Sequence, residues 1–317
     1  MQIPKKITIL VAVLNKKDTI KQCVDSLLAQ KYPYEKILVL DGGSVDDTYE
    51  ILREYKDKID LHQFPNAGLS CRLNWALDNI QTEYTALTDA DCVVDPNWLD
   101  ELIKGFDEKD VIATAGYCGT PKDVSLFQKI IGLELENRFK RFPKYLNRAP
   151  TMNLCLETET ARKVKFDEEQ KVAVETDFGF RLTKLGKIKY CPKALVWHYH
   201  RASLKNYFRQ QKEYAQWGVR LILKHKKRAV SDPITTFGMT IQIPLFFGIL
   251  FFLGLSFFNS LFLYITAVIT GILIFIYLKN VIEIKPPLAY YPLFLLFFAF
   301  RTVSWSIGTL KGALSIS

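Results

Sequence analysis

The sequence predicts an α/β protein with a mostly parallel sheet, followed by helices that cross a membrane. Between Ile7 and Asp91, apolar runs rich in β-branched residues alternate with amphipathic helical segments, as in a sheet covered by helices on both faces. Polar residues follow the ends of several of these runs. From Ile234 onward, long stretches carry almost no charge. These observations indicate a ligand-binding domain in residues 1–230 and a membrane domain in residues 231–317.

The predicted strands and helices follow from residue periodicity. The runs Ile7–Leu14 and Ile37–Leu40 are expected to be buried strands, and Asp18 is expected to cap the helix between them. Asp47 and Thr48 are expected to open a second helix. The pattern continues with a strand near Ile59–Gln63, a helix at about Leu69–Ile80 and a strand that ends at Asp89.

Two carboxylates one residue apart, Asp89 and Asp91, follow the apolar run Tyr84–Leu87. Asp is common in ordinary turns because its side chain bonds nearby backbone amides, so this pattern alone is also typical of a plain turn. However, Asn15 and the segment Asp41–Ser44 follow two other expected strands, and the carboxyl ends of parallel strands meet at one edge of a sheet. Two acidic groups at that edge predict a divalent cation bound beside a nucleotide diphosphate.

The C-terminal apolar stretches are long enough to cross a membrane. Each reaches or approaches the roughly 20 residues that a helix needs to cross a bilayer core of about 30 Å. Their only strongly polar side chains are Gln242 in the first and Arg301 in the third, whereas buried helices of a soluble protein usually keep a polar stripe. Asn259-Ser260 alone separates the first two stretches, which predicts a tight hairpin. The predicted spans are 234–258, 261–278 and 288–310.

Basic residues near these spans predict their orientation. They precede the first span and lie between the second and third, which places both loops in the cytosol. The run Ile7–Leu14 is too short for a secretory signal and precedes Asn15-Lys16-Lys17 rather than a cleavage site. We therefore expect a multi-pass protein of the cell membrane with its N-terminal domain on the cytoplasmic face. The basic residues are Lys224, Lys226, Lys227, Arg228, Lys279 and Lys285.

The net charge of +9 and the six cysteines bear on the partners of the chain. A basic chain can bind nucleic acid, but the main basic cluster abuts the first span, where each Lys or Arg near anionic lipid contributes about 1 kcal/mol. Membrane lipids, and no nucleic acid, are therefore the expected partners. The cysteines are scattered without a CxxC pair, which favours reduced, packed thiols over zinc ligands or disulfides.

Five motifs in order resemble glycosyltransferase family 2, whose fold, GT-A, is a Rossmann-like fold that binds nucleotide-diphospho-sugars. The resemblance covers about 230 residues, up to the membrane spans. It implies an inverting hexosyltransferase that uses Mn²⁺ or Mg²⁺, because a cation stabilises the diphosphate leaving group. The motifs are Val11-Ala12-Val13-Leu14-Asn15, Asp41-Gly42-Gly43-Ser44-Val45-Asp46-Asp47-Thr48, Asn66-Ala67-Gly68 followed by Asn74, Thr88-Asp89-Ala90-Asp91, and Glu175-Thr176-Asp177-Phe178-Gly179-Phe180-Arg181.

The resemblance also implies roles for individual residues. Asp91 would bind the metal directly, Asp89 would lie near the ribose and the metal, and Asp41 would accept a hydrogen bond from the nucleotide base. His198 would complete the metal shell, with His200 as the alternative, because imidazole suits Mn²⁺. A pair of ordinary surface histidines is the other interpretation. The residues implied to bind the nucleotide-sugar are Ala12, Asn15, Asp41, Gly43, Arg72, Asp89 and Ala90.

An inverting transfer needs a base that removes the proton of the acceptor hydroxyl. Many relatives carry Glu-Asp-x-Asp in the last motif, and alignment on Asp177 and Arg181 puts Glu175 at the position of the base. Because Glu is longer than Asp by one methylene, about 1.5 Å, Asp177 is the alternative base. Both acids could instead only stabilise the start of a helix at Phe178–Leu185.

The segment 201–228 differs from that of processive polysaccharide synthases, which carry Gln-x-x-Arg-Trp. Here Gln210 is followed by Glu213 and Tyr214, which argues against a processive polymerase. Aromatic residues interleaved with Lys and Arg predict an interfacial amphipathic helix beside the membrane. A helix packed on protein is the alternative, because an apolar stripe does not distinguish protein from lipid.

These features together predict a membrane-anchored glycosyltransferase that takes a sugar from a nucleotide-sugar in the cytosol. The acceptor is expected to be a polyprenyl-linked glycan or another lipid held at the membrane. A synthase that loads a single sugar onto polyprenyl phosphate would have the same architecture. The remaining alternative, from a different class, is a catalytically inactive sugar- or lipid-binding membrane protein.

Overall fold

The computed structural model describes residues 5–226 and 230–315. They form two compact units, which are described separately here. The first unit consists of the described residues up to 124 and of residues 139–200, and the second of residues 125–138 and the described residues from 201 onward. Lys227 and Arg228, two of the basic residues expected before the first span, lie outside the described residues. The division at residue 230 is drawn from composition and stays a prediction.

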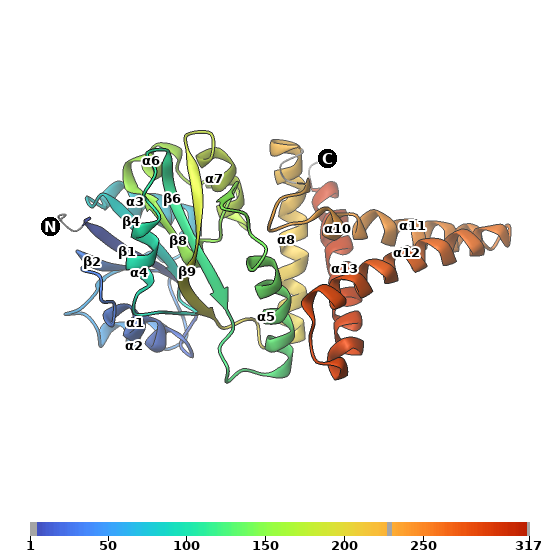
Figure 1. The fold of residues 1–317 in the computed structure, drawn as a ribbon, viewed down its shortest axis with the longest axis horizontal. Coiled ribbons are helices and arrows are strands. Elements are labelled where there is room, and N and C mark those ends of the chain that lie inside the picture. The colour runs from blue at the N-terminus through green and yellow to red at the C-terminus, as the bar shows by residue number, and fades with distance from the viewer. Residues whose placement is uncertain (1–4, 227–229, 316–317) are drawn as a thin grey trace. The chain divides into compact units, whose positions relative to one another are not determined.

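The first unit is built on a sheet that has nine strands among the described residues (Figure 1). Their order is β3-β2-β1-β4-β8-β6-β9-β5, and β7 pairs with β9 outside this path. The predicted α/β sheet is therefore confirmed. The strands are β1 (Ile7–Val13), β2 (Lys36–Asp41), β3 (Asp60–Gln63), β4 (Tyr84–Asp89), β5 (Cys92–Val94), β6 (Val111–Gly119), β7 (Tyr145–Leu146), β8 (Leu154–Glu157) and β9 (Lys187–His198).

The parallel part of the sheet lies where the sequence predicts it. β1 pairs in parallel with β2 on one side and with β4 on the other, and β2 pairs in parallel with β3. Every residue from Ile7 to Val11 is buried, because both faces of the sheet are covered, which explains the uninterrupted apolar run of β1. On one face, α3 (Leu69–Asn79), α6 (Thr158–Val164) and α7 (Val174–Leu182) add apolar side chains such as Leu77, Ala161 and Phe178 to the core.

Beyond β4 the sheet is mixed, and the expectation of a mostly parallel sheet does not hold there. β8 pairs antiparallel with both β4 and β6, and β9 pairs antiparallel with β5 and β7. Only β6 and β9 are parallel neighbours in this part. No helix separates β4 from β5, which Ala90 and Asp91 alone join, so the regular strand-helix alternation of the N-terminal part is interrupted here.

The start of the first helix differs from the expected one. α1 (Ile20–Leu28) has Thr19 at its N-cap position and no side chain that caps it, so the expected cap by Asp18 is wrong. Thr19 Oγ1 donates instead to the carbonyl of Ala90 at 3.0 Å, which ties this turn to the end of β4. The six cysteines, all within the described part of the chain, are free thiols, as expected. The other helices of this unit are α2 (Thr48–Arg53), α4 (Trp98–Lys104) and the 3-10 turn Thr151–Asn153.

The second unit is helical. Three of its helices are long and apolar enough to cross a membrane, at Phe237–Leu255, Leu261–Ile284 and Leu288–Leu314. α11 and α12 form a hairpin whose turn contains Asn259 and Ser260, as predicted (Figure 1). The helices are α8 (Leu204–His225), α10 (Phe237–Thr240), α11 (Gln242–Leu255), α12 (Leu261–Ile284), the 3-10 turn Leu288–Tyr290, α13 (Tyr291–Leu314), and most of α5 (Leu126–Phe139).

α8 packs closely along α13. A Cβ added at Gly308 or Gly312 would lie 2.1 or 2.4 Å from the carbonyl oxygens of Lys212 and Gln216, so only glycine permits this approach. Trp305 Nε1 donates to an amide oxygen on α8 at 2.9 Å. α13 is accordingly half buried along its apolar window, whereas the other two long apolar helices are largely exposed. α8 therefore packs on protein along this face, and its expected location at the membrane interface stays a prediction.

The single charge in the third apolar stretch has an acidic partner. Arg301 is 2% exposed, and its Nη1 donates to Glu134 Oε1 at 2.8 Å. Arg138 Nη2 donates to the other oxygen of Glu134 at 2.7 Å. The guanidinium of Arg301 also lies over the rings of Phe298 and Trp305. One buried carboxylate thus pairs with arginines on two helices.

Glu134→Ala is expected to lower the stability of the protein by on the order of 3–5 kcal/mol, because it leaves the buried guanidinium of Arg301 without a counter-charge. Thermal unfolding in detergent measures this loss. The double variant Glu134→Leu/Arg301→Leu is the control, and should recover much of the stability because the more deeply buried arginine is removed with its partner, whereas Arg138 keeps its hydrogen bond to the carbonyl of Ile234. Equal melting temperatures for the single variant and the parent protein would contradict the prediction.

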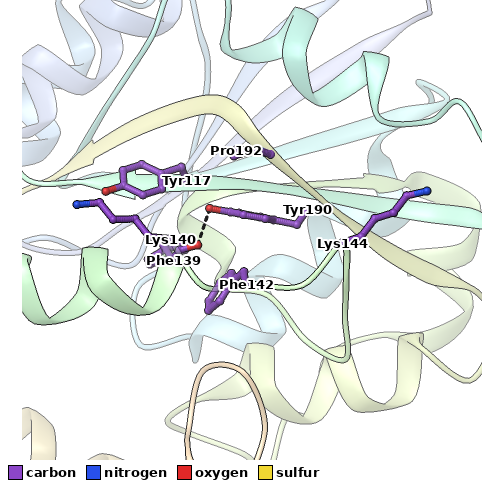
Figure 2. Close-up of a pocket in the computed structure, with 7 residues that line it drawn as sticks. All are labelled: Tyr117, Phe139, Lys140, Phe142, Lys144, Tyr190 and Pro192. Atoms are coloured by element: carbon purple, nitrogen blue, oxygen red, sulfur yellow. Dashed lines mark hydrogen bonds between the residues drawn. The ribbon is translucent and has the colours of Figure 1, made fainter. Parts of the chain in front are cut away.

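An aromatic hollow of about 530 Å³ opens beside β6 and β9 (Figure 2). Its walls are mainly aromatic. Tyr190 Oη donates to the carbonyl of Phe139 at 2.9 Å, and this hydrogen bond holds two of the lining residues together. Lys140 and Lys144 are exposed and extend on opposite sides of it. Nothing in the sequence pattern indicates this hollow, because its residues come from segments far apart in the chain. They are Tyr117, Phe139, Lys140, Phe142, Lys144, Tyr190 and Pro192.

Candidate active site

The predicted site residues of the first, second and fourth motifs lie at or just beyond the carboxyl ends of β1, β2 and β4, which meet at one edge of the sheet. The register places Ala12 beside Asp89 on β4 and beside Leu40 on β2. Ala12 is partly exposed although the rest of β1 is buried, so the edge is accessible at this point. Asn15 lies two residues after β1, and Asp41 is the last residue of β2. Parallel pairing alone therefore brings these residues together.

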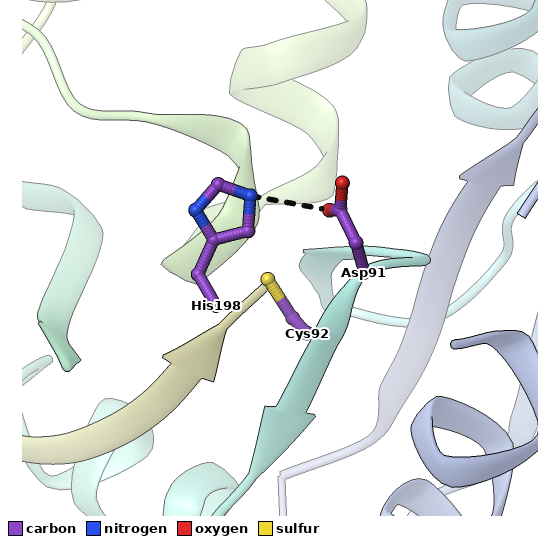
Figure 3. Close-up of side chains that lie close together, drawn as sticks. All are labelled: Asp91, Cys92 and His198. Atoms are coloured by element: carbon purple, nitrogen blue, oxygen red, sulfur yellow. Dashed lines mark ion pairs between the residues drawn. The ribbon is translucent and has the colours of Figure 1, made fainter. Parts of the chain in front are cut away.

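Asp91 is the most tightly surrounded carboxylate at this edge. It is 7% exposed; Lys16 Nζ forms an ion pair with its Oδ2, and His198 Nε2 lies 3.4 Å from its Oδ1 (Figure 3). Burial alone would raise the pKa of Asp91, but the charges and hydrogen bonds of His198 and Lys16 outweigh burial and hold this pKa well below its usual range. Burial likewise would lower the pKa of His198, and Asp91 instead raises it to about 10. Asp91 is therefore an anion with two cationic neighbours.

Asp89 has a different environment from Asp91. It is partly exposed, and its Oδ1 accepts a hydrogen bond from Thr151 at 3.3 Å. Burial and the negative charge of Asp91 raise the pKa of Asp89. Two carboxylates this close repel each other unless a cation lies between or beside them. Lys16 and His198 supply positive charge beside Asp91, and a divalent ion could supply it to both carboxylates.

The donor atoms fit a divalent cation. Asp91, Cys92 and His198 form the one group of potential ligands found among the described residues, with ligand atoms within 4.8 Å of one another (Figure 3). Burial raises the pKa of the Cys92 thiol and Asp91 raises that of His198, so either group would have to lose a proton on binding a metal, and a soft sulfur suits Mn²⁺ less well than an imidazole does. Oxygen ligands with one imidazole suit Mn²⁺. Cys92 is a neighbour that the motif does not indicate.

The two histidines of the predicted metal shell occupy different positions. His198 is the last residue of β9 and lies opposite Cys92 in the antiparallel pair of β5 and β9. This pairing brings the imidazole ring of His198 to Asp91, the residue before Cys92. The Nε2 of His200 instead lies 3.1 Å from Thr120 Oγ1, and its ring packs edge-on against that of His198. His198 is therefore the histidine that faces the carboxylates.

Asp41 holds the loop that follows β2 in place through hydrogen bonds. It is completely buried, and its carboxylate accepts hydrogen bonds from the backbone N–H groups of Gly43 and Ser44, from Ser44 Oγ and from Gln63 Nε2. Gly43 adopts φ +86°, and a Cβ there would meet the Cα of Pro65 at 3.0 Å, so glycine is required. Asp41 thus organises the loop, and its predicted contact with the nucleotide base stays a prediction.

Asp41→Asn is expected to lower the free energy of unfolding by about 1–3 kcal/mol. In the parent protein both carboxylate oxygens accept hydrogen bonds, whereas in the variant an NH₂ group replaces one oxygen and faces donors that it cannot bind. We also expect weaker nucleotide binding, since the loop that Asp41 holds borders the candidate site. Thermal unfolding and nucleotide dissociation constants measure the two effects. Asp47→Asn, in the same loop but exposed, is the control. Unchanged values for Asp41→Asn in both measurements would contradict its role.

Arg72 is directed at the strands rather than into open space. It is 5% exposed, and its Nη1 donates to the carbonyls of Val13 at 2.9 Å and Leu40 at 2.8 Å. Burial lowers the pKa of Arg72, although Asp41 opposes this effect. The guanidinium therefore joins the ends of β1 and β2. The predicted contact between Arg72 and a diphosphate would require these hydrogen bonds to open.

Asn15 joins the first two loops. Its Oδ1 accepts from the backbone N–H of Val45 and its own N–H donates to Ser44 Oγ, both at 2.9 Å. Its φ is +52°, in the left-handed region that Asn tolerates better than most residues. The contact that Asn15 makes with the second loop is absent from any sequence pattern, because it depends on this backbone conformation.

Glu175 and Asp177 both lie in the first turn of α7, which begins at Val174 and therefore earlier than expected. Asp177 is 1% exposed and accepts from Arg181 Nε at 2.7 Å. Glu175 is partly exposed, and burial raises its pKa more than Arg148 lowers it. Glu175 is also close enough to Asp89 for its charge to raise the pKa of Asp89. Asp177 is thus held by Arg181, whereas the partly exposed carboxyl group of Glu175 can contact a ligand.

Comparisons with known proteins agree with this arrangement. The model of the family described as glycosyl transferase family 2 matches residues 8–169. An uncharacterized glycosyltransferase of Rickettsia typhi is 25% identical over 201 residues, which cover 60% of this chain and 62% of that protein. The poly-β-1,6-N-acetyl-D-glucosamine synthase of Staphylococcus epidermidis is 24% identical over 229 residues, which cover 69% of this chain and 56% of that protein. The chain thus spans less than two thirds of the length of these relatives.

Solved structures show the same fold. A mannosyltransferase of Pyrobaculum calidifontis, in complex with GDP-Man and Mn²⁺, is similar over 98% of this chain and 86% of that chain, with a TM-score of 0.58 and 16% sequence identity. At this identity the likeness concerns the fold alone. The GT-A fold implied by the sequence motifs is confirmed.

Proposed function

The chain belongs to glycosyl transferase family 2, and we propose that it is a metal-dependent inverting enzyme that transfers a sugar from a nucleotide-diphosphate-sugar to an acceptor held at the membrane. One observation carries the proposal: Asp89, Asp91 and His198 meet at the carboxyl edge of the parallel strands, with Glu175 close to Asp89. Ligands of this kind suit a divalent ion and a diphosphate. A plain turn would not need a histidine from a distant strand.

The donor is proposed to lie over the ends of β1, β2 and β4. A divalent cation bound by Asp91, Asp89 and His198 would stabilise the diphosphate as it leaves the sugar. The small side chain of Ala12 leaves the edge beside Asp89 open. The loop held by Asp41 borders the other side, where the nucleotide base is expected. These residues would bind and orient the donor.

Glu175 is proposed as the general base. An inverting transfer needs an acceptor hydroxyl to lose its proton as it attacks the sugar carbon on the face opposite the leaving diphosphate. Glu175 is partly exposed and has a raised pKa, which makes its ionised form a stronger base than an ordinary glutamate. Asp177 is not proposed for this step, because Arg181 engages its buried carboxylate.

The acceptor is proposed to be lipid-linked, and a polyprenyl-linked glycan is the class that fits best. Support comes from the presence, on the same polypeptide, of three helices long and apolar enough to cross a membrane. A lipid-linked acceptor would be held where such helices lie. The described basic residues around them, Lys224, Lys226, Lys279 and Lys285, favour a cytoplasmic location for the catalytic unit. Nucleotide-sugars would reach the site from that side.

A donor screen tests the proposal. The purified chain in detergent is incubated with UDP-, GDP- and dTDP-sugars and either Mn²⁺ or Mg²⁺, and nucleotide release is measured. We expect release from one donor class, and loss of this release when the metal is chelated. Binding of a donor without transfer or hydrolysis under any of these conditions would contradict an enzymatic function and favour a binding protein.

Product analysis tests the acceptor. With the active donor, polyprenyl phosphate and a lipid-linked oligosaccharide are offered separately, and the lipid products are separated by mass. Transfer to the oligosaccharide supports the proposal. Transfer to polyprenyl phosphate alone would instead identify a synthase that makes a polyprenyl-phosphate sugar.

A further inference from the structure

We propose that Lys16 is a donor-binding residue whose ammonium group neutralises Asp91 before the donor binds and moves to the donor diphosphate when a divalent cation takes its place. This inference rests on the proposed function and extends it, because it couples metal binding to nucleotide binding through one side chain. Neither the motif pattern nor the resemblance to the family assigns a role to Lys16.

The backbone of Lys16 is fixed while its side chain can move. The left-handed conformation of Asn15 turns the chain at the end of β1, and the N–H of Lys16 then donates to Thr48 Oγ1 at 2.7 Å. From this anchored position the side chain reaches Oδ2 of Asp91. The side chain is 22% exposed, so part of it remains in contact with solvent although most of it is buried. A lysine head group on four flexible methylenes can therefore change partners without any change in the loop.

Asp91 cannot serve Lys16 and a metal equally well. Lys16 forms an ion pair with one oxygen of Asp91, and His198 faces the other. A divalent cation that binds this carboxylate places two further positive charges beside the ammonium group, and like charges at contact distance repel strongly where water is scarce. Lys16 must then release Asp91.

A donor diphosphate gives the released ammonium group a new partner. The diphosphate would lie at the same edge of the sheet, and it gains negative charge as the bond to the sugar breaks. Lysine is a compact point charge that suits phosphate oxygens without demanding a fixed geometry. Lys16 would therefore oppose the binding of metal alone and favour the binding of metal and nucleotide together. Metal and nucleotide binding should then show positive coupling, and the coupling must be equal in both directions.

Binding measurements on Lys16→Met test this inference. The full-length chain in detergent is titrated with Mn²⁺ alone, with free Mn²⁺ followed by electron paramagnetic resonance, and then with UDP and with GDP at saturating Mn²⁺, followed by calorimetry. We expect Lys16→Met to bind Mn²⁺ alone at least about 5-fold more tightly than the parent protein, and to bind the preferred nucleotide at least about 5-fold more weakly. Lys16→Arg keeps the positive charge and should change both constants less.

Lys17→Met is the matched control. Lys17 is the neighbouring residue, but it is exposed and pairs with Asp47 rather than with Asp91. Its substitution should leave both dissociation constants unchanged. If Lys16→Met binds Mn²⁺ and nucleotide as the parent protein does, or binds both more weakly, the proposal for Lys16 is wrong while the proposed function stands. If the parent protein itself binds neither Mn²⁺ nor nucleotide, both proposals are wrong.

Discussion

Glu175→Gln is expected to reduce sugar transfer by about 10²–10⁴-fold and to leave donor binding almost unchanged, because it removes a base and keeps the shape of the side chain. Glu175 contacts neither the proposed nucleotide loop nor Asp91 in any bond described here, so its loss should not affect the donor dissociation constant. The measurements are steady-state transfer with the active donor and calorimetric binding of the same nucleotide. A loss confined to the turnover number would support a role in the chemical step.

The pH profile separates this role from a structural one. Burial raises the pKa of Glu175 above its usual value of about 4.3. The base acts in its ionised form, so transfer should fall as pH decreases through the raised pKa, at a higher pH than an unperturbed glutamate would allow. Glu175→Gln should lose this acidic limb. Glu175→Asp, shorter by about 1.5 Å, should retain the limb and part of the activity.

Glu169→Gln is a suitable control, because Glu169 is an exposed glutamate that precedes the same helix. It should transfer sugar at the rate of the parent protein. Unimpaired transfer by Glu175→Gln would move the base to another group. Asp177 would then be the next residue to test, although Asp177→Asn is also expected to destabilise α7, because its bond to Arg181 would weaken.

The position of the candidate site could be predicted from the sequence because it depends on strand topology. Asp89 and Asn15 lie at the ends of apolar runs that favour buried strands, and because β1 and β4 pair in parallel, their carboxyl ends share one edge. His198 could be connected with Asp91 only through the resemblance to a family, since the antiparallel pairing of β5 with β9 is not visible in residue periodicity. The functional roles of these residues stay predictions.

The partners of individual side chains could not be predicted. Lys16 reaches Asp91 because Asn15 adopts a positive φ, and single-residue backbone conformations are not encoded in hydrophobic periodicity. Arg72 turns to the carbonyls of Val13 and Leu40 rather than to open solvent, because its buried guanidinium needs acceptors, and the carbonyl of Val13 accepts from Arg72 as well as from the N–H of Gly42. A motif thus locates a residue at an edge, whereas the direction of its side chain depends on which buried polar groups still need partners.

The helical unit gives a similar lesson about charge. Arg301 interrupts an apolar stretch, and the sequence places it in a helix without indicating its partner. Glu134 lies in a helix far away in the chain, and the pair forms because the charge of a buried arginine must be neutralised. The three apolar helices follow directly from length and composition. The close approach of α8 to α13 depends on Gly308 and Gly312, whose role becomes apparent only once the two helices are paired.

Asp91→Asn is expected to reduce transfer by on the order of 10³-fold, which corresponds to about 4 kcal/mol of lost transition-state stabilisation. The amide is nearly the same size as the carboxylate but carries no charge, so the change removes the proposed metal ligand without opening a cavity. The parent protein should lose activity on chelation and regain it with Mn²⁺. The variant should respond to neither treatment, because its remaining activity would no longer depend on the metal.

Asp100→Asn on α4 controls for the general loss of a carboxylate, because Asp100 pairs only with the exposed Lys104 in the bonds described. Its transfer rate and its response to chelation should equal those of the parent protein. Thermal unfolding of Asp91→Asn separates loss of the metal ligand from loss of structure: a variant that unfolds at nearly the parent temperature and still transfers no sugar has lost chemistry. If the parent protein still transfers sugar at nearly its full rate after complete chelation of the metal, the proposed metal role of Asp91 is wrong, whatever the activity of Asp91→Asn.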